Sequence, residues 1–499
     1  MRARFGFLLF LCPALLASAH GEEQLELDIA PVDRNKAQVT VLSSPGLHRI
    51  ESSESLAPDS WSGTNRLSSQ TNITFQTSAA RTFLRAQAAP RNDIQIFRAA
   101  LSLIDEGRAT FRHDTFGNES FWTDALKLHL AIAGTNHGGA GPGVSPATAL
   151  AVGLKVDLDA LPQSTRQAIA QGKVDLNAPA TTLALLELDA VVGVKGRFND
   201  ARELTSIGVQ CALCHSTVDD SFAPGIGHRL DGWPNRDLNV GAIINLSPDV
   251  AVLTNALQVD EQTVRTVLQS WGPGRFDAAL VLDGKAFRPD GKSGATVLPP
   301  AFGLAGVNLA TYTGWGSVTH WNAFVGNLEM HGNGTFWDPR LNDTNTFPLA
   351  AKFGYGNVRT TNDLITPKLA ALHFYQLSIP APTPDPSTFN REAATRGELL
   401  FNNKAQCSTC HVPPLYTEPG WNMHTPAEIG IDDFQANRSP DKRYRTTPLR
   451  GLFTRAKGGF YHDGRFENLG AVVDHYNGHL DLELTSEETA DLVEFLKSL

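Results

Sequence analysis

The chain has 499 residues, of which 41% are hydrophobic and 19% charged, a balance that excludes a wholly disordered or fibrous protein. The length favours two or three domains. The formal net charge is −10, from 42 basic against 52 acidic residues, and no Lys/Arg cluster stands out, so nucleic acid is not an expected partner.

The first residues have the pattern of an export signal. Two arginines precede an apolar run from Phe5 to Leu16, and a small-residue Ala-Ser-Ala pattern then ends at Ala19. The run is too short to span a bilayer comfortably, and no later stretch reaches that length. We therefore predict a signal peptide over 1–19, cleavage near Ala19, and a periplasmic or secreted protein without a membrane span.

Residues 22–90 alternate between apolar and polar positions. Five segments are typical of short strands, namely LELDIAPV, QVTVLSS, HRIESS, NITFQT and TFLRAQ, with Pro, Gly, Ser and Asn between them. The pattern predicts a small β-sandwich-like module. It has no evident chemical residues, so a spacer or docking role is the simplest interpretation.

From about residue 91 the pattern becomes helical. Apolar residues at helical spacing predict one helix around 94–104 and a strong amphipathic helix over 119–134. A proline-rich segment, 379–388, is the clearest linker because alternate prolines favour stiff, extended chain. Helices are also predicted in REAATRGELLFNN, directly after the linker, and in SEETADLVEFLKSL at the C-terminus. The predicted domains are therefore 91–378 and 389–499.

Each of these two domains contains one cysteine motif. Both motifs are Cys-x-x-Cys followed directly by histidine: Cys211, Cys214 and His215, then Cys407, Cys410 and His411. On a helix, residues i and i+3 share a face and i+4 lies beside them, so two thiols can bond one porphyrin while the imidazole reaches the iron. This is the attachment pattern of c-type haem. The sequence predicts two covalent haem c groups, with the two histidines as iron ligands.

Three other interpretations of the motifs remain open. A zinc site would use Cys-x-x-Cys as half of a four-ligand set and would not need the adjacent histidine. A thioredoxin-like redox dithiol would need a βαβ context, which the sequence lacks. The third interpretation is chance, which the occurrence of two matches in an exported chain disfavours.

The segment FYHDGRF (460–466), followed by ENLGAVVDHYN, resembles the bacterial di-haem cytochrome c peroxidase superfamily. That superfamily includes the tryptophan-modifying MauG-type enzymes and the rubber oxygenases. The similarity runs from about residue 91 to the end of the chain. It implies a mainly α fold with two c-type cytochrome domains and long loops, here preceded by the small β module.

The resemblance assigns roles around the C-terminal haem. It implies that His462 lines the distal pocket and that the residue fourteen positions later, Tyr476, is the distal iron ligand. A helical face with Leu469, Val472 and Val473 agrees with this placement, although the same spacing fits an ordinary core aromatic. Other candidate ligands are Met423, as the main alternative, and Met330, His475 and His462.

Around the N-terminal haem the resemblance implies three further roles. His228, thirteen residues after His215, would be a switchable distal ligand; the alternative is a surface or hydrogen-bonded histidine. Trp321 would relay electrons between the haems, and Phe336 would line the distal pocket. Both also fit ordinary core aromatics. Other candidates for the relay are Trp233, Trp271 and Trp315.

The superfamily usually binds calcium between its haem domains, and the resemblance implies Asn239 as one ligand. The family's Thr-x-Pro before the HDG segment is here Lys457-Gly458-Gly459, although backbone carbonyls at these positions would still suit calcium.

Together these features predict a periplasmic di-haem oxidoreductase of the peroxidase or MauG type. Its electron donor would be a small cytochrome c or cupredoxin, and it would reduce peroxide or activate oxygen. His228 and His320 are candidate distal acid–base groups. The alternatives are a plain electron-transfer cytochrome without its own substrate, and an oxygenase that acts on an apolar polymer.

Overall fold

The computed structural model describes residues 27–33, 36–41, 48–53, 62–63, 72–76, 83–88 and 91–499. The predicted signal peptide lies outside the described residues. The chain forms two compact units, Met1–Ser102 and Leu103–Leu499, which we describe separately.

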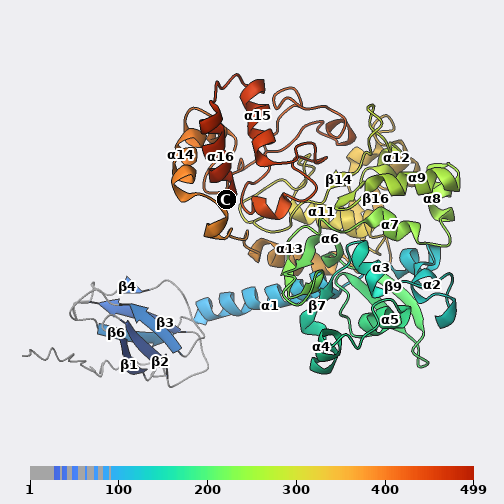
Figure 1. Cartoon of the computed structure of the whole chain (residues 1–499), viewed down its shortest axis with the longest axis horizontal. Coiled ribbons are helices and arrows are strands. Elements are labelled where there is room, and N and C mark those ends of the chain that lie inside the picture. The colour runs from blue at the N-terminus through green and yellow to red at the C-terminus, as the bar shows by residue number, and fades with distance from the viewer. Residues whose placement is uncertain are drawn as a thin grey trace, which may run out of the picture. The chain divides into compact units, whose positions relative to one another are not determined.

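The first unit contains two three-stranded antiparallel sheets, in the orders β1-β2-β5 and β4-β3-β6 (Figure 1). Their strands are β1 (Leu27–Asp33), β2 (Lys36–Val41), β3 (His48–Ser53), β4 (Ser62–Gly63), β5 (Asn72–Gln76) and β6 (Phe83–Ala88). Five of these correspond to the five predicted strands. The predicted sandwich packing depends on loops and side chains outside the described residues, so it stays a prediction.

Helix α1 (Arg91–His113) continues from the first unit into the second and confirms the helix predicted around 94–104. The second unit is mainly helical with small two-stranded sheets. Up to residue 378 its α-helices are α2 (Leu128–Ala133), α3 (Pro146–Ala151), α4 (Gln163–Ala170), α5 (Pro179–Glu187), α6 (Ala212–His215), α7 (Val240–Asn245), α8 (Ala251–Leu257), α9 (Glu261–Trp271), α10 (Leu280–Asp283), α11 (Val318–Phe324), α12 (Pro348–Phe353) and α13 (Leu369–Ser378).

The sheets of this unit are short ribbons between the helices. Strands β8 (Val194–Phe198) and β9 (Leu204–Val209) form the longest antiparallel pair and lead directly into the first cysteine motif. The other pairs are β7 (Val156–Asp157) with β11 (Ile226–Gly227), β10 (Ser216–Val218) with β12 (Arg229–Asp231), β13 (Arg275–Phe276) with β14 (Thr296–Val297), and β15 (Thr335–Trp337) with β16 (Asn357–Arg359).

The single amphipathic helix predicted over 119–134 is wrong. A π-helical turn, Ser120–Ala125, is followed by Lys127 in the left-handed conformation (φ 54°), and α2 begins only at Leu128. The break has a tertiary cause, because Thr123 is fixed to strand β9. Its hydroxyl donates to the carbonyl of Ile207 and accepts from the amide of the same residue, both at 2.8 Å.

The C-terminal part contains α14 (Arg391–Asn402), α15 (Leu469–His479) and α16 (Ser486–Lys497), each where the sequence predicts a helix. Helices α14 and α16 cross closely at Gly397, where an added Cβ would lie 2.1 Å from the Asp491 carbonyl oxygen. Phe401 and Phe495 pack edge to face across this crossing. This helix pair forms one wall of the region around the second cysteine motif.

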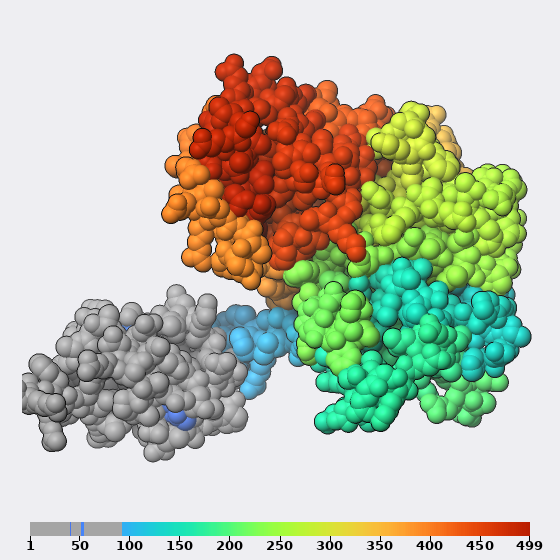
Figure 2. Space-filling view, in the orientation of Figure 1, coloured from blue at the N-terminus to red at the C-terminus, as the bar shows by residue number. Residues whose placement is uncertain are grey.

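The C-terminal part packs against the rest of the second unit, as the orange-to-red and yellow-to-green surfaces in Figure 2 show. Arg438 forms the central contact. Its guanidinium is fully buried and bonds the carboxylates of Asp277 and Asp283. The two acids come from the segment before α11, and Arg438 comes from the segment after the second motif. Their ion pairs therefore hold the C-terminal part against the rest of the second unit. Among the described residues, no helix has the length and apolar character needed to cross a bilayer.

Candidate haem sites

The first cysteine motif lies at the wall of an internal cavity of about 230 Å³. Strand β9 delivers the chain to Cys211, and the short helix α6 then carries Cys214 and His215, so all three side chains line the same space. The rest of the lining is mostly apolar and comes from segments far apart in the sequence, including 296–301, 310–315 and 321–330. The local structure is thus a helical turn facing a cavity, as the haem interpretation requires.

His215 is held in a defined tautomer. Its Nδ1 atom lies 3.1 Å from the carbonyl oxygen of Pro299, and a ring nitrogen facing a carbonyl must carry the proton. The Nε2 atom is then unprotonated, with its lone pair available. Burial lowers the pKa of His215 to about 4, so the ring is neutral at physiological pH. A neutral, oriented imidazole is the form that binds iron.

The second motif repeats this arrangement on a different backbone. Cys407 begins a 3₁₀ turn, Cys407–Thr409, and Cys410 and His411 follow it. The Nδ1 atom of His411 lies 3.1 Å from the carbonyl oxygen of Tyr416. Burial lowers the pKa of His411 to about 4 as well. Both histidines therefore present a free Nε2 atom beside two thiols, a donor set that fits covalent haem at each motif.

The four thiols are free in the structure and do not pair as disulfides. Burial raises the pKa of Cys211 and of Cys214 to about 12, and that of Cys407 to about 11. Reactive dithiols of the thioredoxin type have a lowered pKa because a nearby positive charge or helix N-terminus stabilises the thiolate. The surroundings of these cysteines act in the opposite direction, which disfavours a redox dithiol.

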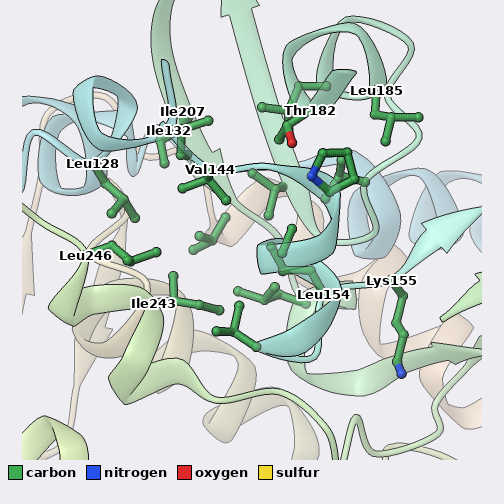
Figure 3. Close-up of a pocket in the computed structure, with 18 of the residues that line it drawn as sticks. Leu128, Ile132, Val144, Leu154, Lys155, Thr182, Leu185, Ile207, Ile243 and Leu246 are labelled. Atoms are coloured by element: carbon green, nitrogen blue, oxygen red, sulfur yellow. The ribbon is translucent and has the colours of Figure 1, made fainter. Parts of the chain in front are cut away.

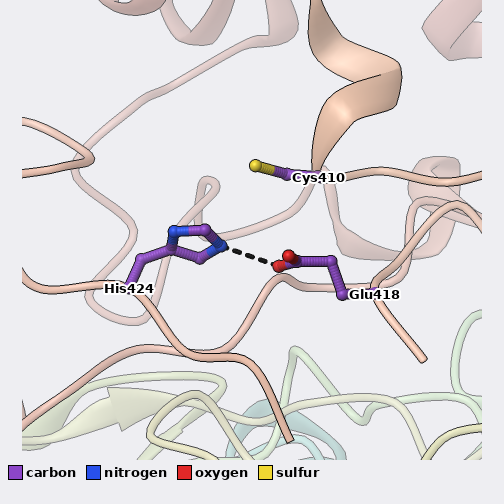
Figure 4. Close-up of side chains that lie close together, drawn as sticks. All are labelled: Cys410, Glu418 and His424. Atoms are coloured by element: carbon purple, nitrogen blue, oxygen red, sulfur yellow. Dashed lines mark hydrogen bonds and ion pairs between the residues drawn. The ribbon is translucent and has the colours of Figure 1, made fainter. Parts of the chain in front are cut away.

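Another metal-ligand group lies next to the second motif. The ligand atoms of Cys410, Glu418 and His424 all lie within 4.8 Å of one another, and His424 Nε2 is 2.7 Å from Glu418 Oε2 (Figure 4). A thiol, a carboxylate and an imidazole are also suitable zinc ligands. The zinc interpretation of this motif therefore stays open on geometry alone. It needs Cys410 as a thiolate, whereas haem attachment would convert the same sulfur to a thioether.

Tyr476 lies on α15 close to the second motif. Burial raises the pKa of its phenol, and the thiols of Cys410 and Cys407 act in the same direction. Its ring is 6.3 Å from that of Tyr461, and a hydrogen bond with the Tyr461 hydroxyl partly offsets the raised pKa. The predicted ligand is thus near the cysteines that would hold the second haem, and its role as an iron ligand stays a prediction.

His462 is 3% exposed and stacks on Tyr444, with ring centroids 5.0 Å apart. Its Nε2 atom is buried and has no hydrogen-bond partner. Burial lowers its pKa to about 4. The other proposed ligands have different surroundings. His475 Nε2 faces the carbonyl of Ile429 at 2.9 Å, and the Met423 sulfur lies against Gly314.

Two residues predicted for the first site, His228 and Phe336, do not line the cavity of the first motif. His228 is at the surface, and its Nδ1 atom is 3.0 Å from Asp159 Oδ1, which matches the alternative of a hydrogen-bonded surface histidine. It therefore has no part in the function proposed below. Phe336 is buried and packs edge to face on Phe324 in an aromatic cluster.

The four tryptophans that are candidates for the electron relay lie in three different places. Trp321 and Trp315 both line the cavity, with ring centroids 6.0 Å apart. Trp233 contacts Phe453 of the C-terminal part at 5.5 Å, and Trp271 packs on Phe276. The relay role of Trp321 stays a prediction, and Trp315 has a similar position on the cavity wall.

The predicted calcium ligand Asn239 caps helix α7, since its side-chain oxygen accepts the amide of Ala242 at 2.9 Å. The carbonyls of Lys457 and Gly459 accept hydrogen bonds from the guanidinium of Arg236. The calcium site stays a prediction.

The sequence reasoning missed Glu329. This residue ends the π-helical turn Val325–Glu329 that follows α11, and its side chain lines the cavity of the first motif. Its Oε1 atom is buried without a partner. Burial raises its pKa well above the ordinary value of 4.5, with a smaller contribution from Asp277, and so favours the protonated acid. In the sequence, Glu329 is the one charged residue of the segment VGNLEM, and this isolated acid is the feature that could have identified it.

A second cavity lies among α2, α3, α5 and α7 (Figure 3). Its volume is about 70 Å³ and its lining is almost wholly apolar, with side chains such as Leu128, Ile132 and Leu185 around it. It contains no cysteine or histidine, so it is a packing cavity of the core and not a haem site.

No protein-family model and no curated protein sequence matches the chain. Among solved structures, the hydrazine synthase of Kuenenia stuttgartiensis is similar at 19% sequence identity, over 43% of this chain and 76% of that chain, with a TM-score of 0.24. A TM-score this low does not establish a shared fold.

Proposed function

We propose that this protein is an exported di-haem c-type oxidoreductase of the peroxidase or MauG type. The observation that carries the proposal is the matched geometry of the two motifs. In each, the histidine donates Nδ1–H to a backbone carbonyl at 3.1 Å and leaves Nε2 free beside two thiols. A bound haem would supply one-electron redox chemistry and, where an axial position is open, reaction with peroxide or oxygen.

The chain's own residues support an enzyme over a plain electron carrier. The cavity beside Cys214 has an acid, Glu329, whose Oε1 atom is buried without a hydrogen-bond partner and whose pKa is raised by burial. An electron carrier needs no such group, and a buried carboxyl without a partner is costly. Cleavage of an O–O bond needs a proton at the leaving oxygen, and Glu329 Oε would hold and deliver it.

The indole of Trp321 forms part of the same wall as Glu329. It belongs to α11, which continues into the turn that ends at Glu329, so one helical segment presents both side chains. Tyr312 lies on the cavity wall and its ring is 6.3 Å from His462 of the C-terminal part. Electrons from the second site would reach the first site through these aromatic side chains.

The first test is the cofactor content of the exported protein. A pyridine haemochrome assay should give two c-type haems per chain, with two iron atoms and no zinc by elemental analysis. Removal of the signal leaves four cysteines, all in the two motifs. Thiol titration of the denatured protein should therefore find no free thiol, since every sulfur would be a thioether. Zinc with free thiols would support the alternative metal site instead.

The second test separates an enzyme from a carrier. Ferric spectra should contain a high-spin component that changes on addition of peroxide, and Glu329→Gln should slow that change by roughly 10²–10⁴-fold, the range typical of a lost general acid. Glu392→Gln is the matched control, because Glu392 is exposed on α14. Two low-spin centres that ignore peroxide would instead establish the carrier.

A further inference from the structure

Three arginines that are wholly or partly buried lie close together, and no carboxylate among the described residues neutralises them. Arg236 and Arg455 are each 6% exposed, and Arg445 lines the cavity of the first motif. All three side chains surround Tyr312, whose hydroxyl influences the pKa of each of them. The positive charges of Arg236 and Arg445 also lower the pKa of Arg455, so the three side chains lie close enough to repel one another. This arginine cluster, Arg236, Arg445 and Arg455, is formed by segments from both sides of the linker.

Each arginine has backbone carbonyl partners for only part of its guanidinium. Arg236 Nη1 donates to the carbonyls of Lys457 and Gly459, at 3.2 and 3.4 Å. Arg455 Nη2 donates to the carbonyl of Arg450 at 3.2 Å, and Arg445 Nε donates to that of Thr311. One further nitrogen of each arginine is buried and has no partner: Nε of Arg236, Nη1 of Arg445 and Nε of Arg455.

No carboxylate acts on these three guanidinium groups, so far as the described residues extend. The nearest acid in sequence, Asp237, is paired with the lysines at 155 and 457. Burial lowers the pKa of Arg445 and Arg455 to about 10, which leaves both charged at neutral pH. Elsewhere the same fold pairs its buried arginine, Arg438, with two aspartates. Uncompensated buried charges are strongly destabilising, so the cluster requires anions that the chain does not supply.

A porphyrin attached at the first motif supplies such anions. Its two propionate carboxylates lie on the edge of the ring opposite the two thioether bonds. The cysteines and Arg445 line one cavity from different segments, so a ring bonded at the cysteines directs its other edge toward the rest of that lining. Guanidinium groups bind carboxylates through paired, charge-assisted hydrogen bonds, and the unpartnered nitrogens are the donors for them.

We propose that Arg236, Arg445 and Arg455 bind the propionate carboxylates of the haem attached at Cys211 and Cys214. The proposal rests on the proposed function, because it requires that haem. It adds the second anchor of the cofactor: thioethers hold one edge of the ring and the arginine cluster holds the other. Since Arg445 and Arg455 follow the second motif, the same contacts bind the C-terminal part to the first haem.

The test is a spectroelectrochemical titration of the purified holoprotein, compared with Arg445→Gln and Arg455→Gln. A cation beside the propionates favours the reduced state, so each variant should lower one of the two midpoint potentials and leave the other unchanged. Arg443→Gln is the matched control. It lies two residues from Arg445 but is exposed, with a contact to Glu428 at 3.8 Å and a hydrogen bond to the carbonyl of Met423 at 3.2 Å, and should change neither potential.

The number of haems per chain distinguishes a failure of the proposed function from a failure of the arginine assignment. Fewer than two haems in the wild-type protein would overturn the proposed function. Two haems per chain with potentials unchanged in both glutamine variants would overturn the arginine assignment alone. If a glutamine variant does not fold, Arg455→Lys keeps the charge but loses the paired donors. It should then lower the same potential by a smaller amount, and an unchanged potential would again overturn the assignment.

Free anions are the other source of carboxylate or phosphate for this cluster. Calorimetric titration of the wild-type holoprotein with inorganic phosphate and with succinate distinguishes them. If propionates fill the cluster, neither anion should bind in a way that Arg455→Lys weakens. One equivalent of phosphate or succinate bound in the wild type and weakened in that variant would make the cluster a site for soluble anions and would overturn the haem assignment.

Discussion

Arg438 Nε lies 2.8 Å from Asp283 Oδ2, with neither side chain exposed to solvent, although the two residues are 155 positions apart in the chain. Asp277 bonds the same guanidinium at 2.9 Å. This buried group joins the segment after the second motif to the segment before α11, and so holds the C-terminal part against the rest of the second unit.

Removal of this guanidinium should destabilise the fold. In Arg438→Met, the carboxylates of Asp277 and Asp283 stay buried without a cation, so we expect the free energy of unfolding to fall by about 3–5 kcal/mol. Chemical denaturation followed by circular dichroism measures this. Arg443→Met removes an exposed ion pair and should cost less than about 1 kcal/mol. Equal losses in the two variants would contradict a special role for the buried pair.

The buried acid Glu329 should make stability fall as pH rises. The native protein keeps a proton on this carboxyl that the unfolded chain releases above about pH 4.5, because burial raises the folded pKa. Unfolding then releases a proton, and the free energy of unfolding decreases with increasing pH above that value. Glu329→Gln should remove this slope in the range above about pH 4.5, where the folded and unfolded pKa values differ. Denaturation curves across that range test it, and parallel curves for the variant and the wild type would show that the carboxyl is ionised in the fold.

The spectrum of a single haem should depend on Tyr476. Tyr476→Phe removes the predicted phenolate ligand, so the ferric absorption and paramagnetic resonance signals of one haem should change while the other haem keeps its signals. Tyr355→Phe, at a tyrosine in the aromatic cluster away from the second motif, is a suitable control. An unchanged spectrum in Tyr476→Phe would eliminate this ligand and leave Met423 as the next candidate.

Each motif histidine should act on its own haem. In His215→Ala and His411→Ala the thiols are untouched, so both haems stay attached while one iron in each variant loses its imidazole. Difference spectra of the two variants against the wild type should therefore be distinct, and their sum should account for the spectrum of the double variant. Loss of the same spectral component in both variants would mean that the histidines do not serve separate centres.

The sequence by itself determined the parts of this protein that depend on local pattern. The spacing Cys-x-x-Cys-His is a covalent requirement of one cofactor, so Cys211 to His215 and Cys407 to His411 predict their chemistry without the fold. Apolar periodicity likewise predicted α14, α15 and α16, because each of these helices buries one face against its neighbours.

Only the tertiary structure decided which distant side chains meet. Thr123 broke a predicted helix because its hydroxyl bonds strand β9, and no local pattern encodes that contact. His228 has a suitable spacing from the first motif but lies at the surface beside Asp159. Glu329 and the arginine cluster gain their significance from burial without a partner, which depends on what surrounds a side chain in space. The sequence specifies which side chains are charged or polar, whereas the desolvation of those side chains depends on the packed fold.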